Sequence, residues 1–420
     1  MKSTYKPLGD YIREVNVRNT DLSVKKLVGV SMEKTFITSV ANIVGVDMSV
    51  YKILKKGQFA CKLMSVGRDE KLPVDIYKED EPAIVSSAYY VFEVIDKNIL
   101  LDDFLFMWLC RPENDRYIGY ISGGDVRGGI SWEVFCETSI RVPPIAKQRE
   151  IVKEYNTIVN RIKLNEQLNQ KLEETAQAIY KQWFVDFEFP DENGKPYKSN
   201  GGAMEYCEEL EKEIPRGWKS GKISDLAKIK HGYAFKGESF TDSETDLILI
   251  SPGNFKITGG FNFEKNKYYD GTYQSSYILK ENDLIVNMTD LSVKGDTLGN
   301  AALIPKVNFK ILLHNQRVGK FEIHNLIYCF YLFFVSNQQN YKHYILGTAT
   351  GTTVRHTSPD RISSFEILIP DEEVVLNFNK IIKPLINLIN QNPSQQYKLN
   401  ELLQLLLSKM TIKELEHEIH

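Results

Sequence analysis

Two long segments of the chain carry apolar residues in steps of three and four. The first segment, from about residue 145 to residue 187, has them at Ile151, Ile158, Leu168, Leu172 and Ile179. The second segment, from about residue 371 onward, has them at Phe378, Ile381, Leu385, Leu388, Leu399, Leu402, Leu406 and Met410. This spacing is typical of helices that pack against each other along an apolar seam. A helix of about 40 residues is about 60 Å long, and two such helices in one chain can pair as an antiparallel coiled coil.

The regions before these two segments have a mixed pattern. Short β-type runs such as Ala83–Val94 and Asp246–Ile250 are separated by turns rich in Gly, Asn and Asp. Each region also holds one apolar block of helical character, Leu100–Cys110 or Leu326–Val335. The pattern therefore predicts an α+β fold, with two domains of mixed α/β structure joined by the two long helices.

The chain repeats its own design. Ser131 and Pro143 recur as Ser358 and Pro370, both 227 positions further on. Earlier in each half the offset loosens, and "KKGQFAC" from Lys55 resembles "KENDLIV" at an offset of 225. We predict five parts: a first domain at 1–143, a helix at 144–187, an acidic linker at 188–213, a second domain at 214–370 and a second helix at 371–420.

Polar residues and prolines interrupt the two seams. Asn165 and Asn392 take the same place in their two helices. A buried seam asparagine fixes the register of a coiled coil at a cost in stability, and the alternative is that both residues are merely exposed. Pro384 and Pro393 are expected to kink or break the second helix.

Composition predicts a cytoplasmic protein. The chain is 42% hydrophobic and 25% charged, as is ordinary for a globular protein. No apolar run reaches the roughly 18–20 residues of a membrane span, and the first residues contain no apolar core of a secretory signal. The five cysteines are scattered without a CxxC pair, which indicates reduced thiols. We therefore expect a cytoplasmic protein that has no membrane partner.

The charge of the chain is unevenly spread. A net charge of −3 argues against nucleic acid. However, the segment from Asp186 to Glu213 holds nine acidic and three basic residues, and the remainder holds 49 basic and 46 acidic residues. A single acidic segment thus conceals a slightly basic chain, and the objection to DNA binding is removed.

The chain lacks the motifs of catalysis. It has no GxxxxGK[ST] phosphate loop, no Asn- or Asp-Pro-Pro-aromatic motif and no HExxH or other metal-binding histidine spacing. The stretch "PDENGK" from Pro190 has the residue types of a nuclease cluster but no strand to frame it. We expect a protein without an active site, metal site or cofactor of its own.

Polar clusters at matched points of both halves are the candidate DNA contacts. Arginine pairs well with guanine and asparagine or glutamine with adenine, while Lys, Ser and Thr suit phosphates. In the second domain the candidates are Tyr233, Lys236, Asn287, Thr289, Lys294, His314, Asn315, Gln316, Arg317, Thr352, Thr353, Arg355 and His356. The blurred equivalents in the first domain are Lys62, Ser65, Arg68, Ser86, Ser87, Tyr89 and Arg127. Phe235 and Phe240 are expected in the core.

Several motifs resemble one protein family. They are "VPPIAKQREIV" (Val142–Val152), "LNEQLNQKLEETAQAIYKQWFVDFEFP" (Leu164–Pro190), "IPRGWK" (Ile214–Lys219), "HGYAFKGESF" (His231–Phe240) and "GTTVRHTS" (Gly351–Ser358). In order and spacing, over essentially the whole chain, they resemble the specificity (S) subunit of type I restriction-modification enzymes.

This resemblance implies a division of labour between subunits. Each of two target-recognition domains would read one half of a split double-stranded DNA site, and the helices would set the spacing and dock two methyltransferase (M) subunits. The M subunits would bind S-adenosylmethionine and methylate adenine, while restriction (R) subunits would use ATP and Mg to cut unmethylated DNA. The alternative is a coiled-coil adaptor with two protein-binding heads and no DNA binding. Affinity for DNA that falls steeply with salt would distinguish the two.

Overall fold

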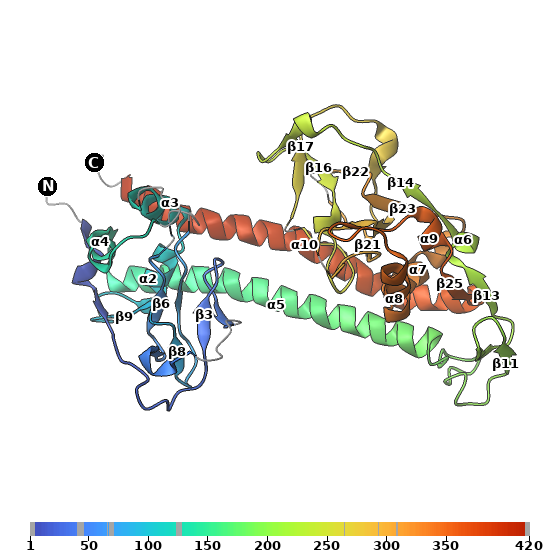
Figure 1. Cartoon of the computed structure of the whole chain (residues 1–420), viewed down its shortest axis with the longest axis horizontal. Helices are drawn as coiled ribbons and strands as arrows, with labels where there is room; N and C mark the ends of the chain where they lie inside the picture. The colour runs from blue at the N-terminus through green and yellow to red at the C-terminus, as the bar shows by residue number, and fades with distance from the viewer. Residues whose placement is uncertain are drawn as a thin grey trace. The chain divides into compact units, whose positions relative to one another are not determined.

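The computed structural model describes residues 5–39, 46–64, 66, 71–122, 128–263, 265–292, 294–307 and 310–415, without the side chains of 392–394 and 409–415. The chain divides into two compact units. One takes in residues before Lys163 and after Lys398, and the other is Lys163–Lys398. Each unit holds one mixed domain together with a part of each long helix (Figure 1).

The first domain is built on a four-stranded antiparallel sheet. Its strand order is β2 (Ile12–Glu14), β9 (Tyr90–Val94), β6 (Phe59–Cys61) and β7 (Val74–Ile76). Three helices follow in the chain: α2 (Asp102–Leu109), α3 (Pro112–Ile121) and α4 (Trp132–Glu137). Phe59, Phe92, Leu105 and Phe135 are fully buried in the core that this sheet shares with the helices.

Three strand pairs complete the first domain. They are β5 (Lys52–Leu54) with β8 (Ala83–Val85), β3 (Val28–Val30) with β4 (Phe36–Thr38), and β1 (Tyr5–Pro7) with β10 (Ser139–Arg141). A bridge between Leu27 and Ile84 runs parallel and links the β3 side to β8. Tyr77 and Val85 lie in a separate small core under these strands.

The second domain repeats the main parts of this plan and adds further strands. Its four-stranded sheet has the order β14 (Ala227–His231), β23 (Val318–Ile323), β19 (Leu284–Asn287) and β21 (Ala301–Leu303). Its five-stranded sheet has the order β15 (Phe240–Thr241), β17 (Lys267–Tyr269), β16 (Leu247–Ile250), β22 (Ile311–His314) and β18 (Ile278–Leu279). The pairing of β16 with β22 is parallel, like the Leu27–Ile84 bridge. The duplication predicted from the sequence is therefore present in the sheet topology.

Some of the remaining elements of the second unit have counterparts in the first domain. They are β11 (Met204–Cys207), β12 (Lys212–Pro215), β13 (Lys219–Lys222), α6 (Ile223–Leu226), β20 (Thr289–Asp290), α7 (Cys329–Val335), α8 (Gln339–Thr348), β24 (Arg355–His356), α9 (Pro359–Ser363) and β25 (Glu366–Ile369). The pair β13–β25 repeats β1–β10, and α7, α8 and α9 follow in the order of α2, α3 and α4.

The two long helices predicted from the sequence are α5 (Ile145–Phe184) and α10 (Glu372–Leu415). Within the second unit they pack antiparallel. The rings of Phe184 and Phe378 lie 4.8 Å apart near the end of α5 and the start of α10. Farther along, Gln396 donates to Glu166 over 2.7 Å. The expected antiparallel coiled coil is confirmed.

Details of the seam differ from the prediction. Leu168, Ile381, Leu388 and Leu402 were expected in the seam but are 43–51% exposed. The buried stripe of α10 keeps the predicted Phe378 but otherwise follows Val375, Ile382 and Ile386. Both stripes step by three and four through apolar residues, so the sequence alone could not choose between them. Asn165 is 3% exposed, as a register residue would be, whereas the Asn392 side chain lies outside the described residues.

Neither proline ends the second helix. Helix α10 continues through Pro384 and Pro393 as one element. A proline inside a helix removes one backbone donor, and α10 tolerates that loss at both positions. The expected break is therefore absent.

The stretch after α5 is an ordered fold rather than an open linker. The rings of Phe189 and Trp218 stack at 5.2 Å, and those of Phe189 and Tyr197 stack at 4.6 Å. Phe187, at φ +61°, turns the chain out of the helix and is itself buried. The acidic segment thus returns along the second domain and ends in the β11–β12 hairpin.

Within the described part of the chain, no helix is long and apolar enough to cross a membrane. All five cysteines are free thiols, as their spacing predicted.

Candidate nucleic-acid interface

The end of β14 and the turn between β22 and β23 form one surface in the second domain. Tyr233 donates its backbone N–H to His314 O over 2.8 Å, and Gln316 N donates to Tyr233 O over 2.9 Å. Gly232 makes this approach possible, because a Cβ there would lie 2.3 Å from Asn315 O. The "HGYAF" motif is therefore explained by close backbone contact with the "HNQR" turn.

A second contact joins two more of the polar stretches. The short strands β20 and β24 pair Thr289 with His356 and Asp290 with Arg355. The Thr289 hydroxyl lies 3.2 Å from His356 Nδ1. The "VNMTD" and "GTTVRH" stretches, 67 positions apart along the chain, are thus held side by side.

A hollow of about 440 Å³ lies where these four stretches meet. It is lined by His231, Gly232, Ala234, Met288, Thr289, Gln316, Arg317, His356 and Thr357. A smaller hollow of about 200 Å³ shares Gln316 and Arg317 and is also lined by Asn315, Phe235, Phe240 and Lys267. Gln316 and Arg317 therefore project from a turn that borders both hollows.

The side chains of Gln316 and Arg317 are exposed. Among the described residues, neither side chain is tied by a hydrogen bond or an ion pair. The bonds at Arg317 involve its backbone, whose N–H donates to Asn315 Oδ1 and whose carbonyl accepts from Met288 N. A planar amide and a guanidinium held side by side on a turn suit base edges in a DNA groove.

Three of the predicted contact residues are buried and instead hold the surface together. Asn287 is 0% exposed, His314 2% and Thr289 4%. Asn287 Nδ2 donates to Thr297 Oγ1 over 2.9 Å, and His314 Nε2 lies 2.8 Å from Val318 O. We therefore assign Asn287 and His314 a structural role in place of the predicted one, whereas Thr289 also lines the larger hollow.

His314 makes the stability of the second domain depend on pH. Burial lowers the pKa of His314 to about 4, well below the value of about 6.5 in an unfolded chain. The unfolded chain therefore binds more protons between these values, and stability is lost as the pH falls from 6.5 toward 4. We expect this residue to account for roughly 3 kcal/mol of that loss.

The change His314→Gln removes the titrating group and keeps a donor for Val318 O. Urea unfolding at pH 7 and pH 4.5 measures the difference between the variant and the natural chain. We expect the natural chain to lose more stability on acidification, and an equal loss in both would contradict this assignment.

The other predicted residues of the second domain are mostly exposed. Tyr233 is 41% exposed, and its ring lies 5.1 Å from that of Phe235. Lys236, Lys294, Thr352 and Thr353 are exposed, and Asn315 is half-buried. Phe235 is buried as predicted, but Phe240 is 43% exposed because it lies on the edge strand β15.

Arg355 is half-buried and precedes His356, which lines the first hollow. A Cβ on Gly295 would lie 3.1 Å from Arg355 Cδ, so the arginine stem packs directly over that glycine. Its Nε atom is buried without a hydrogen-bond partner. An unsatisfied buried donor of a cation is costly, and an anion such as a phosphate would satisfy it.

The first domain presents less of its predicted site. Ser86, Ser87 and Tyr89 lie on the β8–β9 turn, which matches the β22–β23 turn of the second domain. Ser87 is exposed, whereas the Tyr89 hydroxyl accepts from Val30 N over 3.2 Å. Lys62 is half-buried directly after β6. Ser65, Arg68 and Arg127 lie outside the described residues.

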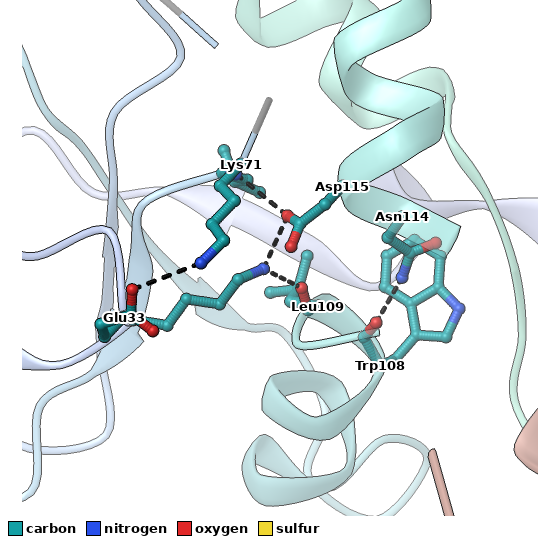
Figure 2. A network of polar contacts seen from close by, with 8 residues as sticks. Glu33, Lys71, Trp108, Leu109, Asn114 and Asp115 are labelled. Carbon is teal, nitrogen blue, oxygen red and sulfur yellow. Dashed lines mark hydrogen bonds and ion pairs between the residues drawn. The ribbon is translucent and has the colours of Figure 1, made fainter. Parts of the chain in front are cut away.

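A buried ion pair anchors Leu72, which lies shortly before β7. Asp115 on α3 accepts from Lys34 Nζ over 2.8 Å and from Leu72 N over 3.0 Å (Figure 2). Lys34 Nζ also donates to Leu109 O over 2.7 Å. Beside this pair, Asn114 Nδ2 donates to Trp108 O. Sequence reasoning missed Asp115 because an aspartate early in a helix is commonly exposed.

Sequence reasoning also missed His231 and Asp290. His231 lines the larger hollow and is the first residue of the "HGYAF" motif. Asp290 follows Thr289 and is buried at 4%. Within the described ranges, no group of three or more His, Cys, Asp or Glu could hold a metal ion. Asp191 of "PDENGK" accepts from the backbone of Asn193 and Lys195, which makes it a turn residue.

A family model and the similar known proteins all indicate the same family. Residues 75–174 and 215–404 match the family described as "Type I restriction modification DNA specificity domain". The chain is 22% identical over 425 residues to the type I restriction enzyme HindI specificity subunit of Haemophilus influenzae, covering 88% of this chain and 89% of that one. It is 23% identical over 334 residues to the type I restriction enzyme MjaIX specificity subunit of Methanocaldococcus jannaschii, covering 77% and 72%.

A solved structure has the same fold. The S subunit of a type I restriction-modification system from M. genitalium aligns over 96% of this chain and 95% of its own, with a TM-score of 0.56 and 14% identity. At that identity the likeness establishes the architecture alone.

Proposed function

This chain belongs to the family of type I restriction-modification DNA specificity subunits, and we propose that each of its two mixed domains reads one half of a split DNA target. It is a DNA specificity subunit and is itself non-catalytic. The observation that carries the proposal is the turn with exposed Gln316 and Arg317 between two hollows. A two-stranded β-ribbon fits the major groove, where glutamine pairs with adenine and arginine with guanine.

The residues around this turn suit the phosphates that flank a target. His231, Tyr233, Lys236, Lys294, Thr352, Thr353 and His356 are exposed around the same surface. Phosphate contacts fix the position of a protein on the duplex, while base contacts specify the sequence. In the first domain we propose the equivalent role for the β8–β9 turn with Ser86 and Ser87.

The long helices have the surface for partner subunits. In the second unit, Leu164, Leu168, Ile381 and Leu388 are 43–58% exposed on α5 and α10. Exposed apolar residues of this kind favour docking of another protein. We propose that the helices dock two M subunits and set the half-site spacing, that R subunits join this complex in the cytoplasm, and that S-adenosylmethionine, ATP and Mg bind only to those partners.

Methylation mapping tests the proposal. The chain is co-expressed with its M subunit, and adenine methylation is read across the host DNA by single-molecule sequencing. We expect one motif made of two specific halves around an unspecific spacer, and affinity of the purified complex for this motif should fall steeply with salt. A single continuous motif, or a stable complex that methylates nothing, would refute the two-domain assignment.

Arg317→Ala should weaken reading of one half of that motif. Loss of a bidentate contact to guanine costs about 1–3 kcal/mol, which raises Kd by about 5- to 150-fold. The matched control is Lys228→Ala, which removes an exposed cation from the other end of β14. Competition with duplexes scrambled in either half measures the effect. Equal losses in the two variants would mean that Arg317 supplies only general charge.

A further inference from the structure

The Asp290 carboxylate is buried at the base of a loop that belongs to the candidate interface. Its Oδ1 accepts from Ser292 N over 2.7 Å. Its Oδ2 accepts from Thr297 N over 2.6 Å and from Thr297 Oγ1 over 2.8 Å. Burial acts to raise the pKa of Asp290, but the hydrogen bonds from Ser292 and Thr297 outweigh it, and the pKa lies below its ordinary value. The carboxylate is therefore charged at neutral pH and closes the loop from both ends.

Further bonds fix the same loop. Ser292 Oγ accepts from Asp296 N over 2.9 Å, and Lys342 Nζ on α8 donates to Asp296 O over 2.5 Å. Residues that point outward from this base are free to meet a ligand: Leu291 is 64% exposed and Lys294 is exposed. Through the β20–β24 pairing, the loop is also tied to Arg355 and His356.

The first domain has a similar bond near the corresponding sheet strands, but its carboxylate comes from a helix, α3. The loop from β6 to β7 takes the place of the loop from β19 to β21 in the matching strand order. Leu72 N, near the end of that loop, donates to Asp115 Oδ1 over 3.0 Å. Asp115 lies on α3, the counterpart of α8, and its offset from Lys342 is again 227 positions.

We propose that Asp290 and Asp115 are positioning residues for DNA reading: Asp290 holds the backbone of Ser292 and Thr297, and Asp115 holds that of Leu72, each in the conformation that meets the target. The inference rests on the proposed function. Neither carboxylate touches DNA in this scheme. A backbone that hydrogen bonds already hold in place loses little entropy on binding, so loosening it weakens specific binding more than general attraction to phosphates.

The second domain is tested with Asp290→Asn and Thr297→Val in the full chain bound to its M subunit. The amide of asparagine turns a donor toward one of the two backbone N–H groups, and valine removes only the hydroxyl donor. Asp283→Asn is the matched control, since Asp283 accepts from Lys280 N and from Lys320 Nζ in the same domain. The duplex is the motif found by methylation mapping, with either half scrambled in turn.

The first domain is tested with a pair of double variants. Lys34→Met with Asp115→Asn removes the ion pair but leaves an oxygen that can accept from Leu72 N. Lys34→Met with Asp115→Leu removes that acceptor as well. The two proteins differ only in the bond to the loop, so any difference between them reports on positioning.

We expect Asp290→Asn to raise Kd for the cognate duplex at least tenfold through one half of the motif, and Thr297→Val to have a smaller effect in the same half. The Asp115→Leu double variant should lose the other half relative to its Asn partner, while binding to scrambled DNA and the melting temperature stay close to the control. Unchanged reading of both halves, or losses in both halves in proportion to a lower melting temperature, would overturn the inference. Failure of the natural chain to read a split motif would instead overturn the proposed function.

Discussion

Replacing Phe378 by alanine is expected to lower the free energy of unfolding of the second unit by about 3–5 kcal/mol, the usual cost of a buried phenylalanine. Phe378 is 0% exposed near the start of α10. Its ring lies 4.8 Å from that of Phe184 and 5.8 Å from that of Trp183 on α5, and 5.9 Å from that of Phe334 on α7. One side chain thus joins both long helices to the domain.

Urea unfolding followed by the fluorescence of Trp183 measures this effect, because the indole adjoins the substituted ring. Leu376→Ala is the matched control, two residues earlier on the same helix and 45% exposed. Exposed substitutions of this kind change stability by about 0.5 kcal/mol or less. If the two variants lost the same stability, the aromatic cluster would not be what holds the helices to the domain.

Much of the fold could be predicted because apolar residues recur at regular spacing and the two halves of the chain repeat each other. Matching segments such as Lys55–Cys61 and Lys280–Val286 become β6 and β19 with the turns before them, at equivalent places in two sheets of the same order. The choice of stripe on α10 could not be predicted. Ile381 and Ile382 are chemically alike neighbours, and only the partner elements around α10 bury the second of them.

The candidate site was predictable as a set of stretches and less so as a set of residues. Polar clusters at the ends of buried strands must either face solvent or satisfy the backbone beside them, and sequence does not distinguish the two. Gln316 and Arg317 face solvent, whereas His314 is buried and bonds to the backbone oxygen of Val318. The same ambiguity hid Asp290, whose partners Ser292 and Thr297 are recognisable only once the loop is closed.

Asp115→Ala is expected to destabilise the first unit by about 3–5 kcal/mol, because it leaves the ammonium group of Lys34 buried without its counter-charge. The side chains of Lys34 and Asp115 are only 9% and 13% exposed. After the substitution, Lys34 Nζ keeps its bond to Leu109 O among the described residues, and Leu72 N loses its bond to Asp115 Oδ1. Urea unfolding followed by the fluorescence of Trp108, whose backbone adjoins this network, measures the loss.

Two comparisons separate the buried charge from the rest of the change. Asp80→Ala breaks the exposed pair between Lys56 and Asp80, whose side chains are 59% and 90% exposed, and exposed pairs contribute about 0–1 kcal/mol. Adding Lys34→Met to Asp115→Leu removes both charges, and apolar replacement of a whole buried pair is often neutral or stabilising. We therefore expect the double variant to recover most of the stability that Asp115→Ala loses. If it recovered none, the loss would come from the bond to Leu72 N, and Asp115 would support the domain itself as well as its loop.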